Sequence, residues 1–321
     1  MAVTIHSEPQ AYSPSDNPLT FVFSSNQTAQ ANFYYIVRVF VDGNLVSEHQ
    51  IFPEVGARSH FDASERISQY VDSANIQTAF DQSAGNFTEY YITVQEYYGT
   101  PASPQASATS TTLVAFKACL PNIEWESWDY TDYASDQANA TFLTQFPTGQ
   151  QYMCGVDEDV FLQLITLENS VDVEVELFDI TGTSIVSDSD TYSTAHIHQF
   201  NVGIESVYTE FSGISSSDFD DCYYYVVTVD DGGVETEFTI YKDNACTYEY
   251  PPIRFYFLSR IGSIEAFTFA CLNRTKGSIT SETYARQYGG WNGTDYTYNA
   301  TTGRTIAYTT NTVETLEANR S

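Results

Sequence analysis

The segment from Val171 to Leu177 alternates apolar and acidic residues without interruption. A period of two is typical of a β-strand with one buried and one solvated face, so Asp172, Glu174 and Glu176 are expected to point to water. No stretch of the chain has the 3.6-residue apolar spacing of a three-turn helix. The sequence therefore predicts an all-β protein, with at least about 40% strand and under about 12% helix.

Other local patterns agree with this fold class. Tyrosine (25) and phenylalanine (21) are abundant while methionine (2) is scarce, and aromatic residues favour pleated, half-buried surfaces. Asp42-Gly43-Asn44 and Asp230-Asp231-Gly232-Gly233 separate strand-like runs and predict hairpin turns. Ser64 to Val71 predicts one or two helical turns. Ile253 to Leu258 and Ile264 to Phe269 flank Gly262 and predict a further hairpin.

Three sequence elements recur once, in the same order. Two of the offsets are 139 residues, from Phe61 to Phe200, and 133 residues, from Tyr90 to Tyr223. The matching elements are Tyr35–Gly43 with Val171–Gly182, Phe61 with Phe200–Asn201, and Tyr90–Gly99 with Tyr223–Gly232. The repeat predicts two β-sandwiches in tandem, and the Tyr-rich third element resembles the penultimate strand of immunoglobulin-like (Ig-like) and fibronectin type III domains. A double jelly roll is the alternative.

Composition also predicts the domain boundaries. Residues 101–118 begin with a Pro/Ser/Ala/Thr stretch that has no periodicity, and we expect a linker or loop there. Residues 1–100 then form an N-terminal β-sandwich. Residues 119–321 form a C-terminal β-sandwich domain with an extended C-terminal segment.

The charge balance excludes two classes of partner. The chain has 42 acidic and 12 basic residues, a net charge of −30. Nucleic acids and anionic membrane surfaces both require an excess of lysine and arginine, so neither is expected as a partner. The N-terminus has neither the basic nor the apolar region of a signal peptide, which predicts folding in a cytoplasm. The five cysteines are then expected to be reduced and mostly buried.

No residue pattern nominates a catalytic site, and we expect a protein that is not an enzyme. Aspartates at Asp218–Asp221 and Asp230–Asp231 are the places where calcium could bind, but they lack the spacing of a known calcium loop, so no cofactor is expected. His196 and His198 could pair on one strand face as zinc ligands, without a third ligand nearby in sequence. We expect both histidines to lie at the surface or at an interface.

Large side chains without an obvious cover predict an interface. Tyr34, Ile36 and Phe40 share one face of the strand Phe33–Val41, while the alternate residues form the core face. A sandwich buries only one face of each sheet, so this second face requires another domain or subunit. The remaining candidate interface residues are the tryptophans, which could alternatively stack on sugars: Trp125, Trp128 and Trp291.

Three segments resemble the virion structural proteins, often of tail or baseplate type, of phages that infect Bacteroidota. They are Arg254–Phe269, Phe142–Pro147, and the pair Phe33–Val41 with Phe61-Asp-Ala-Ser64. The resemblance implies a non-enzymatic tail, neck or baseplate component, located in the virion, that forms oligomers with itself and with other virion proteins. The alternatives are a capsid or vertex protein, or a carbohydrate-binding or adhesin module.

Overall fold

The computed structural model confirms the all-β prediction, with 52% strand and 11% helix. It describes residues 3–54, 58–73, 76, 79–83, 85–137, 140–149, 151–153, 155, 157–167, 170–193, 196–242, 253–269, 273–285, 289–291, 296–298 and 305–318. The chain divides into two units. The first comprises Met1–Cys246 with Tyr256–Phe267, and the second comprises Thr247–Phe255 with Thr268–Ser321.

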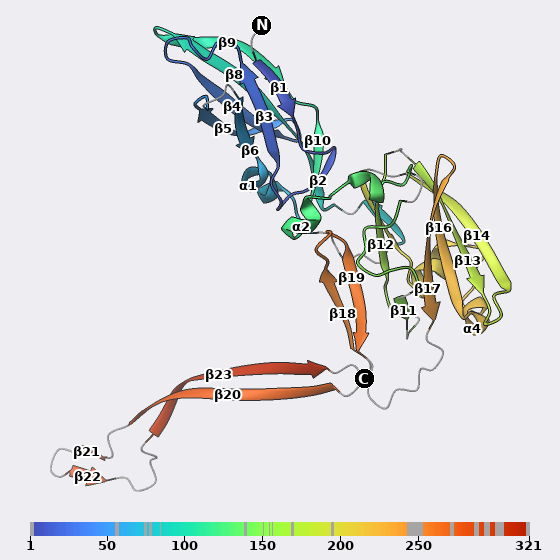
Figure 1. Ribbon diagram of the computed structural model, residues 1–321. Coiled ribbons are helices and arrows are strands. Elements are labelled where there is room, and N and C mark those ends of the chain that lie inside the picture. The colour runs from blue at the N-terminus through green and yellow to red at the C-terminus, as the bar shows by residue number, and fades with distance from the viewer. Residues whose placement is uncertain are drawn as a thin grey trace. The chain divides into compact units, whose positions relative to one another are not determined.

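The first unit begins with a β-sandwich (Figure 1). Its larger sheet has the strand order β2-β10-β8-β4-β5, with β9 also on β8, and its smaller sheet has the order β1-β3-β6. Burial alternates along β4 and β8, so one face of each packs on the smaller sheet and the other faces outward. The bounds of the larger sheet are β2 Tyr12–Pro14, β10 Leu113–Phe116, β8 Phe87–Gly99, β4 Tyr34–Val41, β5 Asn44–Ile51 and β9 Ala102–Thr109. Those of the smaller sheet are β1 Val3–Ser7, β3 Thr20–Ser25 and β6 Arg58–Asp62.

A second β-sandwich follows in the same unit. Its larger sheet has the order β11-β17-β16-β13-β14, and its smaller sheet has the order β12-β15-β7. On β13, Val171, Val173, Val175 and Leu177 are buried, as the alternation predicts. Of the acidic residues between them, Asp172 and Glu174 are exposed and Glu176 is partly exposed. The strand bounds are β11 Gln151–Met153, β17 Val234–Lys242, β16 Tyr224–Asp231, β13 Ser170–Phe178, β14 Ser184–Ser193, β12 Phe161–Ile165, β15 Ile197–Asn201 and β7 Asp81–Ser83.

The larger sheets of the two sandwiches share one strand order, which accounts for the predicted repeat. The smaller sheets differ in their third strand, which is β1 beside β3 in the first and β7 beside β15 in the second. Strands β4, β6 and β8, which hold the first copies of the repeated elements, correspond to β13, β15 and β16. In both sandwiches a short strand also pairs in parallel with the last strand of the larger sheet, β2 on β10 and β11 on β17. The chain therefore contains tandem Ig-like β-sandwiches and not a double jelly roll.

The predicted linker at residues 101–118 is wrong. This segment forms β9 and β10, which both pair with β8 in the larger sheet of the first sandwich. Its small, polar residues suit an edge strand that is solvated on one side, and such a strand lacks the apolar alternation of an inner one. The boundary at residue 100 is also too simple, because β7 from the N-terminal part of the chain pairs with β15 of the second sandwich.

The hairpin turns predicted at Asp42–Asn44 and Asp230–Gly233 are present, each with a two-residue loop. Val41 pairs with Asn44 across Asp42 and Gly43, whose φ angles are 48° and 76°. Asp231 pairs with Val234 across Gly232 and Gly233, whose φ angles are 65° and 96°. Positive φ at both central residues is the requirement of the type I′ hairpin turn, which Asp and Gly fulfil.

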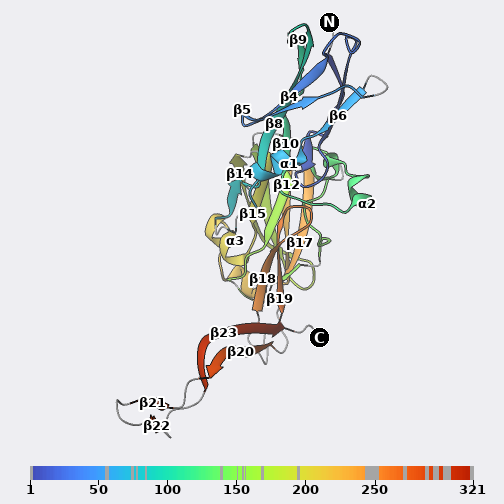
Figure 2. The ribbon, with the colours of Figure 1, turned by 90° about the vertical axis from the view of Figure 1, so that its left-hand side faces the viewer.

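Helices are short, and the remaining strands form hairpins. The helical turns are α1 Ser64–Ile67 and the 3₁₀ turn η1 Ser68–Tyr70, as predicted, then α2 Asn122–Trp125, η2 Tyr130–Tyr133, α3 Ile204–Glu210 and α4 Asp218–Asp221. The hairpins pair β18 Ile253–Leu258 with β19 Ile264–Phe269, β20 Asn273–Ala285 with β23 Thr305–Ala318, and β21 Gly289–Trp291 with β22 Tyr296–Tyr298 (Figure 2). Among the described residues, no helix has the length and apolarity to cross a membrane.

Candidate functional site at the junction of the two sandwiches

The two sandwiches are joined by a strand that leaves one and enters the other. Residues Asp81–Ser83 of β7 pair with Phe200, Gln199 and His198 of β15. The residue before them, Phe80, is buried in the core of the second sandwich, where its ring meets that of Phe211 edge to face with centroids 5.0 Å apart. The second sandwich is therefore completed by residues that precede strand β8 of the first.

A separate apolar cluster fills the space at the junction. It contains residues from β2 and β10 of the first sandwich together with Trp128, Leu143, Ile165, Ile197 and Ile261. Trp128 is only 8% exposed. Its Nε1–H donates to the carbonyl oxygen of Tyr12 (3.1 Å), and its ring stacks on Tyr133 with centroids 5.1 Å apart. A buried, hydrogen-bonded tryptophan is a strong packing anchor.

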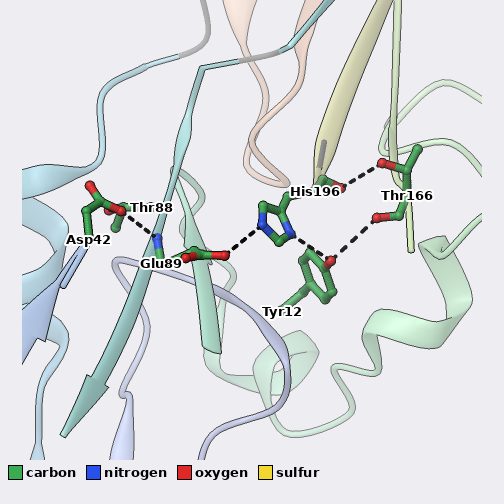
Figure 3. A network of polar contacts seen from close by, with 6 residues as sticks. All are labelled: Tyr12, Asp42, Thr88, Glu89, Thr166 and His196. Atoms are coloured by element: carbon green, nitrogen blue, oxygen red, sulfur yellow. Dashed lines mark hydrogen bonds and ion pairs between the residues drawn. The ribbon is translucent and has the colours of Figure 1, made fainter. Parts of the chain in front are cut away.

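A polar network crosses the same junction (Figure 3). The hydroxyl of Tyr12, on β2, lies 3.1 Å from Nδ1 of His196, which precedes β15. Nε2 of His196 lies 3.0 Å from a carboxylate oxygen of Glu89 on β8. The backbone N–H of Thr166 donates to the carbonyl oxygen of His196 (2.8 Å), which fixes the loop that carries the imidazole.

This network is satisfied in both charge states of the imidazole. With neutral His196, Nε2–H donates to Glu89 and the Tyr12 hydroxyl donates to Nδ1. With the imidazolium, Nδ1–H donates to the Tyr12 oxygen, and the hydroxyl turns to the carbonyl oxygen of Thr166 at 3.4 Å. Burial, with smaller contributions from Tyr130, Glu89 and Asp136, raises the pKa of Tyr12 to about 12, so its hydroxyl stays protonated. The hydrogen bonds between the two sandwiches can therefore form with either form of the imidazole.

The two histidines considered as zinc ligands do not share a partner, and His198 is buried in the second sandwich and not at the surface as expected. His196 is bound to Glu89, whereas Nε2 of the buried His198 contacts Asp81 of β7. His196 also has a φ of 49°, which takes it out of the strand that holds His198. Among the described residues, no group of three His, Cys, Asp or Glu side chains is arranged to hold a metal ion.

Three of the five aspartates considered for calcium have structural partners. Asp218 accepts from the backbone N–H and the hydroxyl of Ser215 (2.7 and 2.6 Å), and these bonds lower its pKa. Asp230 accepts from the N–H of Gly233 at 2.7 Å and so closes the hairpin turn. The buried Asp231 accepts from the hydroxyl of Ser135.

The six predicted interface residues fall into three groups. Tyr34, Ile36 and Phe40 lie half-buried on the outward face of β4, where Tyr34 stacks on Tyr97 and Phe40 on Tyr91, with centroids 5.2 and 4.7 Å apart. Trp125 and Trp128 are together at the junction, the first partly exposed and the second buried. Trp291 lies on β21, and its side chain is outside the described residues.

Of the five cysteines, the structure describes two. Cys222 is buried, as predicted, and burial raises the pKa of its thiol to about 11. Cys119 is exposed, contrary to the expectation of mostly buried thiols. The other three, Cys154, Cys246 and Cys271, lie outside the described residues.

Two cavities flank the junction. The first, about 540 Å³, is lined by five carboxylates. Three of them have partners, since His198 contacts Asp81, Asn201 donates to Asp159 (2.7 Å), and Tyr192 donates to Glu210 (3.2 Å). The second, about 290 Å³, lies beside Trp128 and Tyr133 and includes Arg260, which forms an ion pair with Glu124.

Sequence reasoning missed the residues that build the junction network. Tyr12 and His196 are 184 residues apart, and Glu89 and His196 are 107 apart. No local pattern links such positions. The one signal that could have indicated them is the repeat, because it implies that the end of one sandwich must meet the start of the next.

Comparison with known proteins does not assign the chain to a family. No family model and no curated protein matches the chain. A titin structure aligns with 76% of this chain and 98% of its own length at 13% identity and a TM-score of 0.25. The Bacteroides uniformis β-glucuronidase aligns with 62% of this chain at 9% identity and a TM-score of 0.20, and only 28% of that protein is covered. TM-scores this low support no conclusion, and the fold assignment rests on the strand topology above.

Proposed function

We propose that this chain is a non-enzymatic structural component of a bacteriophage virion, of tail, neck or baseplate type, that assembles through protein–protein contacts of its β-sandwiches. The observation that carries the proposal is the junction. The junction combines strand β7, which precedes the first sandwich's strand β8 but pairs in the second sandwich, with a shared apolar cluster and a polar network. These contacts hold the two domains in one arrangement. A fixed spacing between domains is what a component of a symmetric particle requires.

Two of the three segments that resemble phage virion proteins meet at this junction. Glu265, in Arg254–Phe269, accepts from the backbone N–H of Gln145 (2.5 Å) and the hydroxyl of Thr144 (3.2 Å), both in Phe142–Pro147. The turn of the same hairpin accepts a hydrogen bond at Gly262 O from Asn86 (2.9 Å). Two of the motifs behind the resemblance therefore contribute contacts to the junction.

The aromatic face of β4 supports assembly more than sugar binding. Tyr34 and Tyr97 are nearly parallel, as are Phe40 and Tyr91, so these rings turn their faces to one another. A sugar-binding platform requires a ring face open to the ligand. Edges of stacked rings on an open sheet suit a protein partner better.

A carbohydrate-binding or adhesin module is the second candidate, and the cavity beside Trp128 and Tyr133 is the observation that favours it. Aromatic rings next to Arg260 and Asp132 could hold a saccharide ring. A capsid or vertex position is a variant of the first proposal.

The test is to locate the chain in particles. An antibody against it would be used for immunogold labelling of purified phage from the host strain, together with mass spectrometry of the particles. We expect labelling at a fixed position and a constant copy number per particle. Absence from purified particles, combined with binding of the soluble chain to a glycan array, would favour the adhesin module.

A further inference from the structure

The net charge of the chain is distributed unevenly between its two units. The second unit has six basic residues (Arg254, Arg274, Lys276, Arg286, Arg304, Arg320) and five acidic ones (Glu249, Glu282, Asp295, Glu314, Glu317), a net charge of +1. The first unit therefore has 37 acidic and 6 basic residues, a net charge of −31. Electrostatic repulsion between copies acts on the sandwiches and spares the C-terminal part.

The main element of the second unit is a long two-stranded ribbon, defined here as β20 with β23. Its strands have 13 and 14 residues and pair from Asn273 with Ala318 to Ala285 with Thr305. Among the described residues, no third strand joins it. A two-stranded sheet alone in water is marginally stable at best, and its outer edges present unpaired backbone N–H and C=O groups.

The middle of one face of the ribbon is mostly polar and open to solvent. Register places Ser278 opposite Val313 and Thr280 opposite Asn311 on the same face, followed by Glu282 opposite Thr309. Ser278, Thr280 and Glu282 are exposed, and Val313 is 59% exposed. On the other face the register pairs Ile279 with Thr312 and Leu316 with Thr275, and Tyr284 pairs with Ile306 near one end, so apolar residues along the ribbon are few and scattered. Backbone pairing at the edges is the main stabilisation left to this element.

We propose that the ribbon pairs edge to edge with the ribbon of a second copy of this chain, forming a sheet of four or more strands. The inference rests on the proposed function, in which the chain is an assembly component, and adds the partner and the element. Two ribbons of nearly zero net charge approach without repulsion. Edge strands of two sandwiches would repel each other, since the edge strand β14 includes Asp188 and Asp190 and lies in a unit of net charge −31.

The ribbon could instead dock on the acidic sandwich of a neighbouring copy. The salt dependence of association distinguishes this docking from pairing between ribbons. Pairing between ribbons is opposed only by repulsion of the sandwiches they carry, so it should strengthen as salt screens that repulsion. Docking of the second unit, whose net charge is +1, on an acidic sandwich should weaken with salt. The direction of the salt dependence therefore identifies the partner surface.

The experiment is sedimentation velocity of the full chain at about 0.05 M and about 0.5 M NaCl. The test variant is Ser278→Glu with Thr280→Glu, which adds two charges to the ribbon. The matched control is Ser107→Glu with Thr109→Glu, which adds the same charges to exposed positions of another edge strand, β9. We expect self-association that increases with salt and that falls roughly tenfold in the ribbon variant, because charges on a sheet edge oppose pairing. The control should match the wild type at each salt concentration.

Three results would overturn the proposal: a monomer at every salt concentration, association that weakens with salt, or equal association in the ribbon variant and the wild type. Each of them leaves the virion proposal standing, because immunogold labelling and particle composition do not depend on self-association of the purified chain. Conversely, a chain absent from particles could still pair through its ribbons.

Discussion

At the scale of single residues, the two sandwiches differ in how they satisfy the hydroxyl of a buried tyrosine. Tyr90 and Tyr225 are fully buried near the start of β8 and β16. The hydroxyl of Tyr225 donates to the carbonyl oxygen of Val202 (2.7 Å), 23 residues upstream, as the resemblance to Ig-like domains implies. The buried hydroxyl of Tyr90 has no partner within the described part of the chain. We expect Tyr225→Phe to lower the free energy of unfolding by about 1 kcal/mol and Tyr90→Phe to leave it unchanged or raise it. Chemical denaturation of both variants checks this, and equal losses in the two would contradict it.

Glu265 gives a second prediction at this scale. It is 3% exposed, and burial raises the pKa of its carboxyl above the ordinary value of 4.5 although three donors bond it. A raised folded pKa favours folding at pH below the unfolded value, and this contribution disappears as the pH rises through the folded value. Glu265→Gln keeps the acceptor oxygen and removes the charge, so we expect a higher melting temperature than wild type at pH 8 and a smaller difference at pH 5. Glu126→Gln, at an exposed position, is the control. An increase in the melting temperature of Glu265→Gln that is equal at pH 5 and pH 8 would contradict the prediction.

At the scale of elements, two glycines separate backbone strain from close packing. Gly232 (φ 65°) is in the β16–β17 turn with open space around it, whereas a side chain on Gly262 (φ 89°) would collide with the carbonyl oxygen of Lys117. We expect Gly232→Val to cost roughly 1–2 kcal/mol from backbone strain alone. Gly262→Val should cost clearly more, since the hairpin turn would also have to move away from the junction. Thermal unfolding of the two variants measures this difference. Equal losses of stability would show that the close contact between Gly262 and Lys117 can relax to admit a side chain.

The same turns show what the sequence could predict at this scale. Asp42-Gly43 and Gly232-Gly233 were identifiable because the positive φ of a tight turn selects those residue types locally. Strand β9 was mistaken for a linker because an edge strand of Ala, Ser and Thr lacks apolar alternation. Strand β7 has only three residues, and its pairing with β15 depends on a fold that must already exist. The junction network was beyond sequence reasoning for the same reason: Tyr12, Glu89 and His196 meet only after both sandwiches have formed.

At the scale of the whole first unit, the junction determines whether the two sandwiches unfold together. Strand β7 and the cluster around Trp128 belong to both, so unfolding of either sandwich exposes apolar surface of the other. We therefore expect one cooperative transition for residues 3–242, whereas tandem domains with a small interface normally unfold separately.

Trp128→Ala tests this coupling. Truncating a buried tryptophan costs about 3–5 kcal/mol, and here the loss falls on the contact between the sandwiches while their own cores stay intact. Calorimetry should show one transition in the wild type and two in the variant. Hydrogen exchange, followed at β4 and at β13, should show equal opening free energies before the substitution and different ones after it.

Val227→Ala, in the core of the second sandwich, is the control. It should lower the melting temperature of the single transition without splitting it, because the intact junction transmits the loss to both sandwiches. Two transitions in the wild type would show that strand exchange and the shared cluster are too weak to couple the sandwiches, and would remove the main support for the fixed spacing on which the structural role depends.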